Sequence, residues 1–261
     1  KAIEMLDTEN DDIHKIIETY RILAADRDNI TYDYGKNIKD FKGVDLDYLQ
    51  EKIKLFNPNH SEKFDFPKPH GGGTAYMNTI DKDGLGVSLI QSNFHGIGSR
   101  IGVGSFGFFL HNRGCGFNLD SKHPNYLTPG RKPLHTLSPT IWSKNGNLEF
   151  IAGTRGGRYQ PQLLIQTILP YIQKSDSFEE IIKKPRWVIE NFSSETISKL
   201  RFEKINNEDL EILLKKGHEV EVENKLNKAY GPISIIYKKD DGNFEGVCDV
   251  RVGTEKVFNS F

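Results

Sequence analysis

Hydrophobic residues recur at helical spacing in the first part of the chain. In residues 12–24, the apolar positions Ile13, Ile16, Ile17, Tyr20 and Leu23 fall on one helical face. Asn10 or Asp11 is a plausible N-cap for this helix. A second helix is predicted over 46–56, behind Asp45. The prolines and the missing period of 57–73 indicate an exposed loop or linker.

From Thr74 the pattern changes to alternation of apolar and polar residues, which is typical of strands. Three pairs of such segments flank a two-residue turn signal, Asp-Gly or Asn-Gly, and each pair predicts a β-hairpin. The pairs are 74–80 with 85–92, 138–144 with 147–153, and 233–239 with 244–250.

The remaining segments complete the order of elements. Residues 95–107 form a glycine-rich loop, 108–112 predict a short strand, and 113–136 are irregular. Helices are predicted over 159–174 and over 207–216, the second ending at Gly217. Helices, strands, helices and strands follow one another, which favours an α+β fold with antiparallel pairing over a doubly wound parallel sheet.

Composition narrows the class of protein. The chain has 261 residues, of which 36% are hydrophobic and 27% charged, and its formal net charge is -1. This balance gives no indication of a nucleic-acid partner or a membrane surface. With only two cysteines, Cys115 and Cys248, a reducing compartment is expected, and we expect the cytoplasm. The chain begins at Lys1 without a signal pattern, and we expect it to be a piece of a longer precursor.

Two glycine motifs resemble known sites but lack the required context. Residues 102–107, GVGSFG, match the dinucleotide fingerprint, yet a glycine-rich segment precedes them and a strand-like run follows. Residues 70–73, HGGG, resemble the oxyanion loop of lipases, a fold that also needs a G-x-S-x-G elbow. The nearest serine, Ser105, has Val103 at the position of the first glycine. A lipase-like hydrolase is therefore a weak alternative.

The sequence contains no nucleotide-binding Walker motif and no HExxH motif, and its eight histidines are scattered singly. We therefore expect no metal site and no cofactor.

The three glycines before Thr74 raise a chemical question, because glycine is a poor start for a strand. The simplest interpretation is that Thr74 is only a good strand former. The alternative is that the flexible backbone lets the Thr74 hydroxyl attack the carbonyl of Gly73. Scission would leave Thr74 with a free α-amine of pKa about 7.7–8.0. Such an amine can act as general base for its own hydroxyl.

Several spaced motifs, in order, resemble the catalytic part of the gamma-glutamyltranspeptidase family. They are TAYMNTIDKDGLGVSLIQS (74–92), GIGSRIGVGSFGFFLHNRG (96–114), PGRKPLHTLSPTI (129–141) and GTRGGRYQPQLLIQ (153–166). Segment 18–28 resembles the end of that family's large subunit, and PRWVIE and GHEVEV resemble its C-terminal part. The resemblance implies an N-terminal-nucleophile hydrolase with a four-layer αββα sandwich. The upstream half of that sandwich would precede Lys1.

The resemblance also implies roles for individual residues. Thr74 corresponds to the nucleophile, and self-cleavage would occur between Gly73 and Thr74. Ser92 takes the place of a threonine whose hydroxyl supports the nucleophile, and serine can form the same hydrogen bond. Gly156 and Gly157 correspond to the glycine pair whose amides form the oxyanion hole, a role that suits residues without side chains.

At the substrate positions the sequence departs from the family. Gly116 stands where the family binds the γ-glutamyl ammonium with an acid, and Phe94 where an asparagine contacts the carboxylate. His135 and Thr136 replace a serine pair, and Arg113 replaces a neutral polar residue. We expect these positions to bind an acyl group that has a carboxylate without the neighbouring ammonium, as in glutaryl-like amides. The alternative is that Arg113 pairs with a nearby acid and an upstream residue supplies the missing contact.

Together these observations predict two regions. Residues 1–73 would be the end of the large-subunit region with its linker, and residues 74–261 the small-subunit catalytic region. The expected activity is that of an amidohydrolase or acyltransferase acting on a small amide or peptide through a Thr74 ester. The expected partner is the large-subunit portion, in a heterodimer of processed subunits or a higher oligomer. The alternative is an inactive fragment or binding module that retains the fold.

Overall fold

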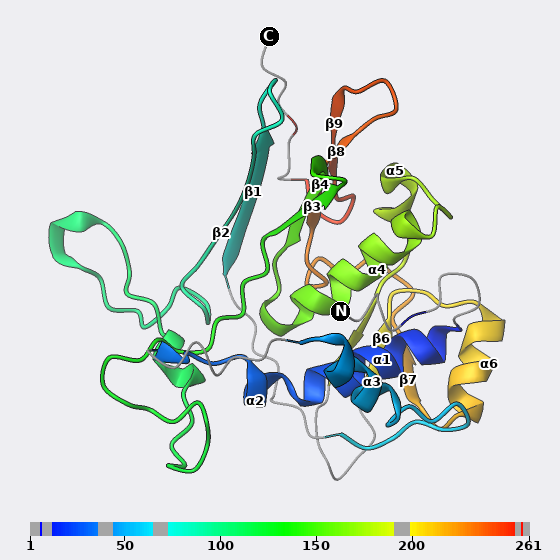
Figure 1. Cartoon of the computed structure of the whole chain (residues 1–261), viewed down its shortest axis with the longest axis horizontal. Coiled ribbons are helices and arrows are strands. Elements are labelled where there is room, and N and C mark those ends of the chain that lie inside the picture. The colour runs from blue at the N-terminus through cyan, green and yellow to red at the C-terminus, as the bar shows by residue number, and fades with distance from the viewer. Residues whose placement is uncertain are drawn as a thin grey trace.

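The computed structural model describes residue 6, residues 12–35, 44–64, 73–190 and 199–253, and residue 257. Figure 1 shows a strand-rich sandwich beside a second lobe of helices and a small sheet. None of the helices in these residues is long and apolar enough to cross a membrane.

The sandwich consists of two sheets packed face to face. Strands β1 (Thr74–Ile80) and β2 (Gly86–Ser92) form an antiparallel hairpin. Strands β3 (Thr140–Lys144), β4 (Asn147–Thr154), β8 (Ile233–Lys238) and β9 (Phe244–Cys248) form a four-stranded antiparallel sheet in the order β3-β4-β8-β9. All three predicted hairpins are therefore confirmed. Asn145 and Gly146 both have positive φ angles, 50° and 79°, as the tight turn between β3 and β4 requires.

Strand β4 is buried on both faces, so its side chains alternate between two layers. Phe150 and Ala152 pack with α4 (Gln160–Ile172) and α5 (Phe178–Ile181), whereas Gly153 faces the β1–β2 hairpin. The ring of Tyr76 lies so close to Gly153 that a Cβ atom there would be 2.1 Å from it. The described residues thus form a helix–sheet–sheet stack. In an αββα sandwich the remaining helical layer would cover the outer face of β1–β2.

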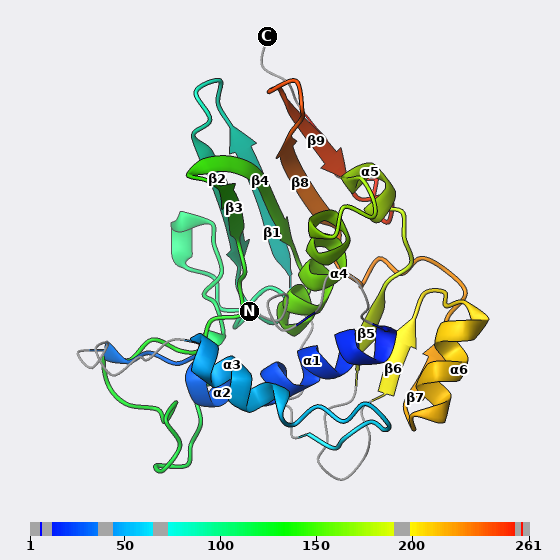
Figure 2. The ribbon, with the colours of Figure 1, turned by 45° about the vertical axis from the view of Figure 1, so that its right-hand side comes forward.

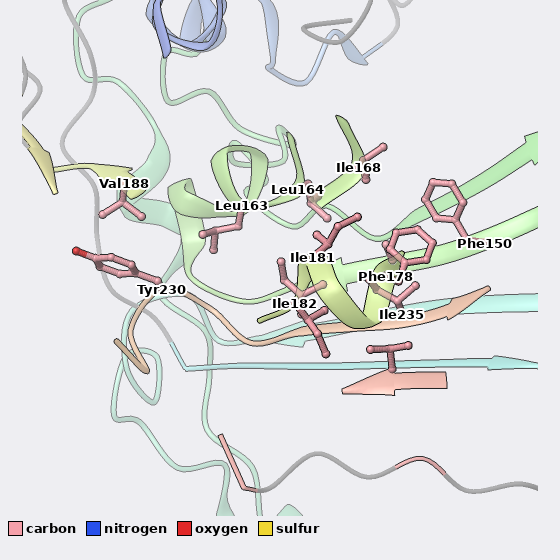
Figure 3. Close-up of a cluster of buried hydrophobic side chains, with 13 residues drawn as sticks. Phe150, Leu163, Leu164, Ile168, Phe178, Ile181, Ile182, Val188, Tyr230 and Ile235 are labelled. Atoms are coloured by element: carbon pink, nitrogen blue, oxygen red, sulfur yellow. The ribbon is translucent and has the colours of Figure 1, made fainter. Parts of the chain in front are cut away.

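One hydrophobic cluster holds the helical layer against the four-stranded sheet, and Figure 3 shows its side chains converging between α4, α5 and β8. Its buried members are Phe150, Ala152, Leu163, Leu164, Ile168, Phe178, Ile181, Ile182, Val188, Tyr230, Ile233, Ile235 and Val247. Helix α4, which corresponds to the helix predicted over 159–174, supplies three of these residues, Leu163, Leu164 and Ile168.

In the second lobe, the first helix of the chain lies beside strands from the later part of the sequence (Figure 2). Helix α1 (Ile13–Ala25) packs against a three-stranded sheet of β5 (Trp187–Ile189), β6 (Lys199–Phe202) and β7 (Glu219–Val222). Helix α6 (Asn207–Lys215) contributes Leu213 to the same core, and Gly217 after it has φ +80°, as its predicted role at the helix end requires. Strand β6 pairs antiparallel with β5 and parallel with β7.

The ends of the first helices partly differ from the predictions. Asp12 caps α1 by accepting a 2.8 Å hydrogen bond from the amide of Lys15, while the expected caps Asn10 and Asp11 lie outside the described residues. Asp45 caps α3 (Leu46–Ile53) as predicted, although the helix ends three residues early. A short helix α2 (Arg27–Ile30) follows α1 and was not predicted.

The strand predicted over 108–112 is wrong. This segment forms one isolated bridge, from Phe109 to Gly102, and otherwise runs as a loop. The side chain of Asn112 accounts for the loop conformation, because its oxygen and its nitrogen both form hydrogen bonds with the main chain of the preceding loop. Its Oδ1 accepts from the amide of His95 (2.9 Å), and its Nδ2 donates to the carbonyls of His95 (3.3 Å) and Gly98 (3.1 Å).

Candidate active site

The hairpin register brings Thr74 and Ser92 together. Thr74 is the first residue of β1 and Ser92 the last of β2, and their Cα atoms are direct partners across the ladder. The Ser92 hydroxyl donates a 2.9 Å hydrogen bond to the carbonyl oxygen of Gly73 and accepts one of 3.0 Å from the amide of Phe94. A hydroxyl donor therefore lies on the carbonyl of the bond expected to be cut.

Gly73 has a steric reason to be glycine. A Cβ atom there would lie 2.9 Å from the carbonyl oxygen of Gly96, closer than real Cβ contacts come. The main chain of the glycine-rich loop 95–107 thus packs directly against the residue before Thr74. The preceding residues 65–72 lie outside the described part of the chain.

The packing of the two sheets puts the glycine pair at the same end as Thr74. Tyr76 packs on Gly153, and Gly86, the partner of Ile80 at the far end of the hairpin, packs on Ile151. The start of β1 therefore lies over the end of β4. This places Thr74 at the same end of the sandwich as Gly156. Figure 2 shows the start of β1 and the start of α4 at this end of the sandwich.

Gly156 and Gly157 form the turn between β4 and α4. Their φ angles are +120° and +58°, conformations that side chains disfavour, and they join β4 to the short 3₁₀ turn Gly157–Tyr159 ahead of α4. Neither residue has a side chain that could cover its amide, which is what the predicted oxyanion hole requires. The role itself stays a prediction.

The loop that follows β4 is supported from the β8 side. Thr154 is fully buried, and its hydroxyl donates to the carbonyl of Pro232 (2.8 Å). Gly231 lies against the carbonyl of Arg155, where a Cβ atom would be 2.2 Å away. Arg186 holds Gly231 by donating to its carbonyl (2.6 Å). None of these residues was predicted from the sequence, and their one sequence signal is that Thr154 and Arg155 directly precede the glycine pair.

Arg113 lies next to the Thr74–Ser92 pair. It is only 6% exposed, and its guanidinium donates to the Ser92 carbonyl (3.3 Å) and the Thr136 hydroxyl (3.5 Å). Its Cζ atom lies 5.2 Å from the centre of the Phe94 ring, which is within the range of a cation–π contact. The structure thus brings Arg113, Thr136 and Phe94, three of the predicted substrate positions, around Ser92.

Phe94 adopts an unusual backbone. Its φ of +79° is rare for a bulky residue and marks a strained position. The hydrogen bond from its amide to Ser92 and the contact of its ring with Arg113 hold it there. The strain is thus located beside the proposed nucleophile.

His135 and Gly116 flank this group. His135 is an exposed residue, although the protein covers part of its imidazole. This partial burial and, after it, the positive charge of Arg113 lower the pKa of the imidazole. Gly116 lines a cavity of about 170 Å³, and a Cβ atom there would make ordinary contacts, the nearest at 3.6 Å from the Leu134 carbonyl. The other lining residues are Phe94, Cys115, Phe117, Asn118, His123, Asn125, Leu134 and Arg158.

A separate buried group lies in the second lobe. His14, Glu18 and His218 bring potential metal ligands together within the described residues. The ring nitrogens of His14 and His218 are 2.7 Å apart, a hydrogen-bond distance. Two nitrogens on one tetrahedral zinc ion, each at about 2.0–2.1 Å, would be roughly 3.3 Å apart. Arg21 also pairs with Glu18, so this group already has its own charge partner.

Comparison with known proteins identifies the family of this chain. The sequence profile of the family Gamma-glutamyltranspeptidase matches residues 2–258. The chain is 31% identical over 245 residues to the glutathione hydrolase-like YwrD proenzyme of Bacillus subtilis, covering 91% of this chain and 45% of that protein. It is 30% identical over 247 residues to the oxamate amidohydrolase proenzyme of Klebsiella pneumoniae, covering 92% and 46%. It thus spans about half the length of these relatives.

Among solved structures, cephalosporin acylase from Bacillus halodurans matches with a TM-score of 0.79 and 26% identity, over 96% of this chain and 47% of that one. Helicobacter pylori gamma-glutamyltranspeptidase matches in fold, with a TM-score of 0.57 and 22% identity, over 68% of this chain and 99% of that one. The fold is that of the N-terminal-nucleophile hydrolases, as predicted. On this sequence match and this shared fold, the chain belongs to the gamma-glutamyltranspeptidase family.

Proposed function

We propose that this chain is the C-terminal half of a self-processing threonine amidohydrolase or acyltransferase. The observation that carries the proposal is the hydrogen bond from the Ser92 hydroxyl to the carbonyl oxygen of Gly73, at the start of the strand that begins with Thr74. A donor on this oxygen polarises the carbonyl and stabilises the negative charge that develops during attack.

The processing step consumes only one molecule of water. The Thr74 hydroxyl oxygen bonds to the Gly73 carbonyl carbon, the C–N bond between the two residues breaks, and the Thr74 nitrogen takes up a proton. Water then hydrolyses the resulting ester. The products are a chain that ends at Gly73 and a chain that begins at Thr74 with a free amine.

The mature site would use the same hydroxyl on an external amide. The free amine of Thr74 accepts the hydroxyl proton as the oxygen attacks, since an α-amine in a model peptide has a pKa of about 7.7–8.0. The amides of Gly156 and Gly157 bind the tetrahedral oxyanion, and the amine of the substrate leaves. Water or an acceptor amine then releases the acyl group from the Thr74 ester. The substrates are γ-glutamyl or related acyl amides, as the names of the glutathione hydrolase and oxamate amidohydrolase relatives suggest.

A region encoded upstream of Lys1 would complete the sandwich. The relatives named above are proenzymes of about twice this length. In our proposal their additional half corresponds to a large-subunit portion that pairs with residues 74–261 after processing. The boundary between residues 1–73 and 74–261 stays a prediction.

The test is processing of the chain expressed with its upstream coding sequence. We expect two fragments, the smaller beginning at Thr74 by N-terminal sequencing. Thr74→Ala should abolish both cleavage and amide hydrolysis, whereas Thr74→Ser should retain part of each. The control is Thr79→Ala, at an exposed position of the same strand. A cut elsewhere, or an intact active chain, would refute the mechanism. An intact inactive chain would favour the alternative of a binding module.

A further inference from the structure

Arg113 is a buried cation whose contacts with the described residues carry no compensating charge. Its two hydrogen-bond acceptors, the Ser92 carbonyl and the Thr136 hydroxyl, are both neutral. Among the described residues, no Asp or Glu forms an ion pair with it. Burial lowers the pKa of its guanidinium, and no acid contributes in the opposite direction.

Such an arrangement is unusual for a purely structural arginine. Burying an unpaired charge is expensive, so buried arginines are normally paired with a carboxylate. The same chain follows that rule elsewhere: Arg186 pairs with Asp249, and Arg251 pairs with Glu203, all of them buried. Arg113 differs from them in lying beside the predicted nucleophile and in lacking the anion.

The surroundings of Arg113 fix its orientation. The Phe94 ring lies against the guanidinium, and the Phe94 backbone is itself held by the Ser92 hydroxyl. Arginine offers a planar fork of donors that matches a carboxylate. A charge held this rigidly loses little conformational entropy when it binds an anion.

The lining of the neighbouring cavity offers no carboxylate to an ammonium. No Asp or Glu is among the described residues that line it. An ammonium entering this space would therefore find no side chain of opposite charge in the wall. Gly116 adds no side chain to the wall, and a Cβ atom there would make only ordinary contacts with Leu134.

We infer that Arg113, supported by Thr136 and Phe94, binds a carboxylate on the acyl group of the substrate, and that this acyl group has no neighbouring ammonium. The inference rests on the proposed function, since it needs Thr74 to take the acyl group. It assigns the substrate to amides of dicarboxylic acids, such as succinyl and glutaryl amides, in preference to γ-glutamyl amides.

The experiment compares kcat/KM for four anilides on the processed enzyme: succinyl, glutaryl, γ-glutamyl and the uncharged butyryl. The wild type should prefer one of the two dicarboxylic anilides over γ-glutamyl anilide by about tenfold or more, which corresponds to about 1.4 kcal/mol. Arg113→Gln should reduce kcat/KM for the dicarboxylic anilides by about 100-fold, or about 2.7 kcal/mol, with little change for butyryl anilide. Arg113→Lys should recover part of the loss.

The control is Arg100→Gln, which removes the charge of an exposed arginine in the neighbouring loop and leaves the contacts of Arg113 in place. Free glutarate should inhibit the wild type more strongly than free glutamate. Preference for γ-glutamyl anilide, or an equal loss on all anilides in Arg113→Gln, would overturn the inference. The second result would mean that Arg113 pairs with an acid of the upstream region or only positions Ser92. Failure of the proposed function is distinct, because the wild type would then neither cleave itself nor hydrolyse any anilide.

Discussion

The Ser92 hydroxyl donates its hydrogen bond to the carbonyl oxygen of Gly73, one residue before the predicted nucleophile. The same oxygen atom of Ser92 accepts from the amide of Phe94, and the hydroxyl proton points to Gly73 because a carbonyl oxygen can only accept. The two contacts join the end of β2 to the bond that precedes β1. Ser92 is therefore placed to act on the peptide carbonyl before cleavage as well as to support Thr74 afterwards.

We expect Ser92→Ala to slow self-cleavage, because the carbonyl of Gly73 loses a donor that strengthens as the oxyanion forms. Loss of one such donor typically lowers a rate by about 10²–10³-fold. Ser92→Thr keeps the hydroxyl and should cleave at a rate close to wild type. A time course of fragment appearance on a denaturing gel measures both. Cleavage of Ser92→Ala at the wild-type rate would remove Ser92 from the mechanism.

We expect Gly156→Ala to lose most activity. Its φ of +120° is one that alanine avoids, so the loop must turn and carry its amide away from the oxyanion. The expected loss is about 10²–10³-fold in kcat, with a smaller change in KM. Gly217→Ala is the matched control, because Gly217 also has positive φ (+80°) with open space around it but lies after α6. Equal activity losses in the two variants would indicate general destabilisation.

Acid should destabilise the second lobe through the His14–His218 pair. Burial, and after it the charges of His14 and Arg21, lower the pKa of His218 to about 3, and burial also lowers the pKa of His14. The folded state therefore binds fewer protons than the unfolded state below pH 6.5. For His218 the stabilisation is complete above about pH 6.5 and falls as the pH drops towards 3, by up to about 1.4 kcal/mol per pH unit, and the lowered pKa of His14 acts in the same direction.

Denaturant unfolding between pH 7 and 4.5 tests this directly. The free energy of unfolding of His218→Gln should fall less steeply with acid than that of the wild type, whatever its absolute value. His60→Gln, at an exposed position, should leave the slope unchanged. Glu18, Arg21, Lys216 and Asp12 surround the pair and stay in place in both variants. A wild-type slope in His218→Gln would contradict the assignment.

The chain alone should be poorly soluble. The outer face of the β1–β2 hairpin exposes Met77 (55%), Val87 (48%) and Leu89 (49%), a contiguous apolar surface. Size-exclusion chromatography should show aggregates or oligomers, and Val87→Thr with Leu89→Thr should reduce them. Coexpression with the upstream region should protect the same face. A monomer that unfolds cooperatively without that region would contradict the expectation.

The sequence predicted those parts of the fold that local signals determine. Asn145-Gly146 requires positive φ angles at both residues, so it specified its hairpin directly. Strands β5 and β6 were missed because segments of three and four residues carry no readable period, and their pairing depends on packing against α1. The run 108–112 looked like a strand, yet the side chain of Asn112 bonds the loop main chain instead.

In the candidate active site, too, local signals were predictable from the sequence and long-range contacts were not. The pairing of Thr74 with Ser92 follows from the hairpin, so the sequence contained it. The burial of Arg113 could not be read from its neighbours, because it depends on Thr136 and on the left-handed backbone of Phe94. The support of the glycine pair by Thr154 and Gly231 joins segments 77 residues apart and leaves no local pattern.

The contact between Tyr76 and Gly153 has a consequence for how this protein can vary. The aromatic ring occupies the volume that any side chain at position 153 would need, so the two positions constrain each other. In homologues we expect them to change together, with a small residue at 76 wherever 153 has a side chain. Because Thr74 lies two residues from Tyr76 and Gly156 three residues from Gly153, an uncompensated change would move the predicted nucleophile away from the predicted oxyanion hole without altering either residue.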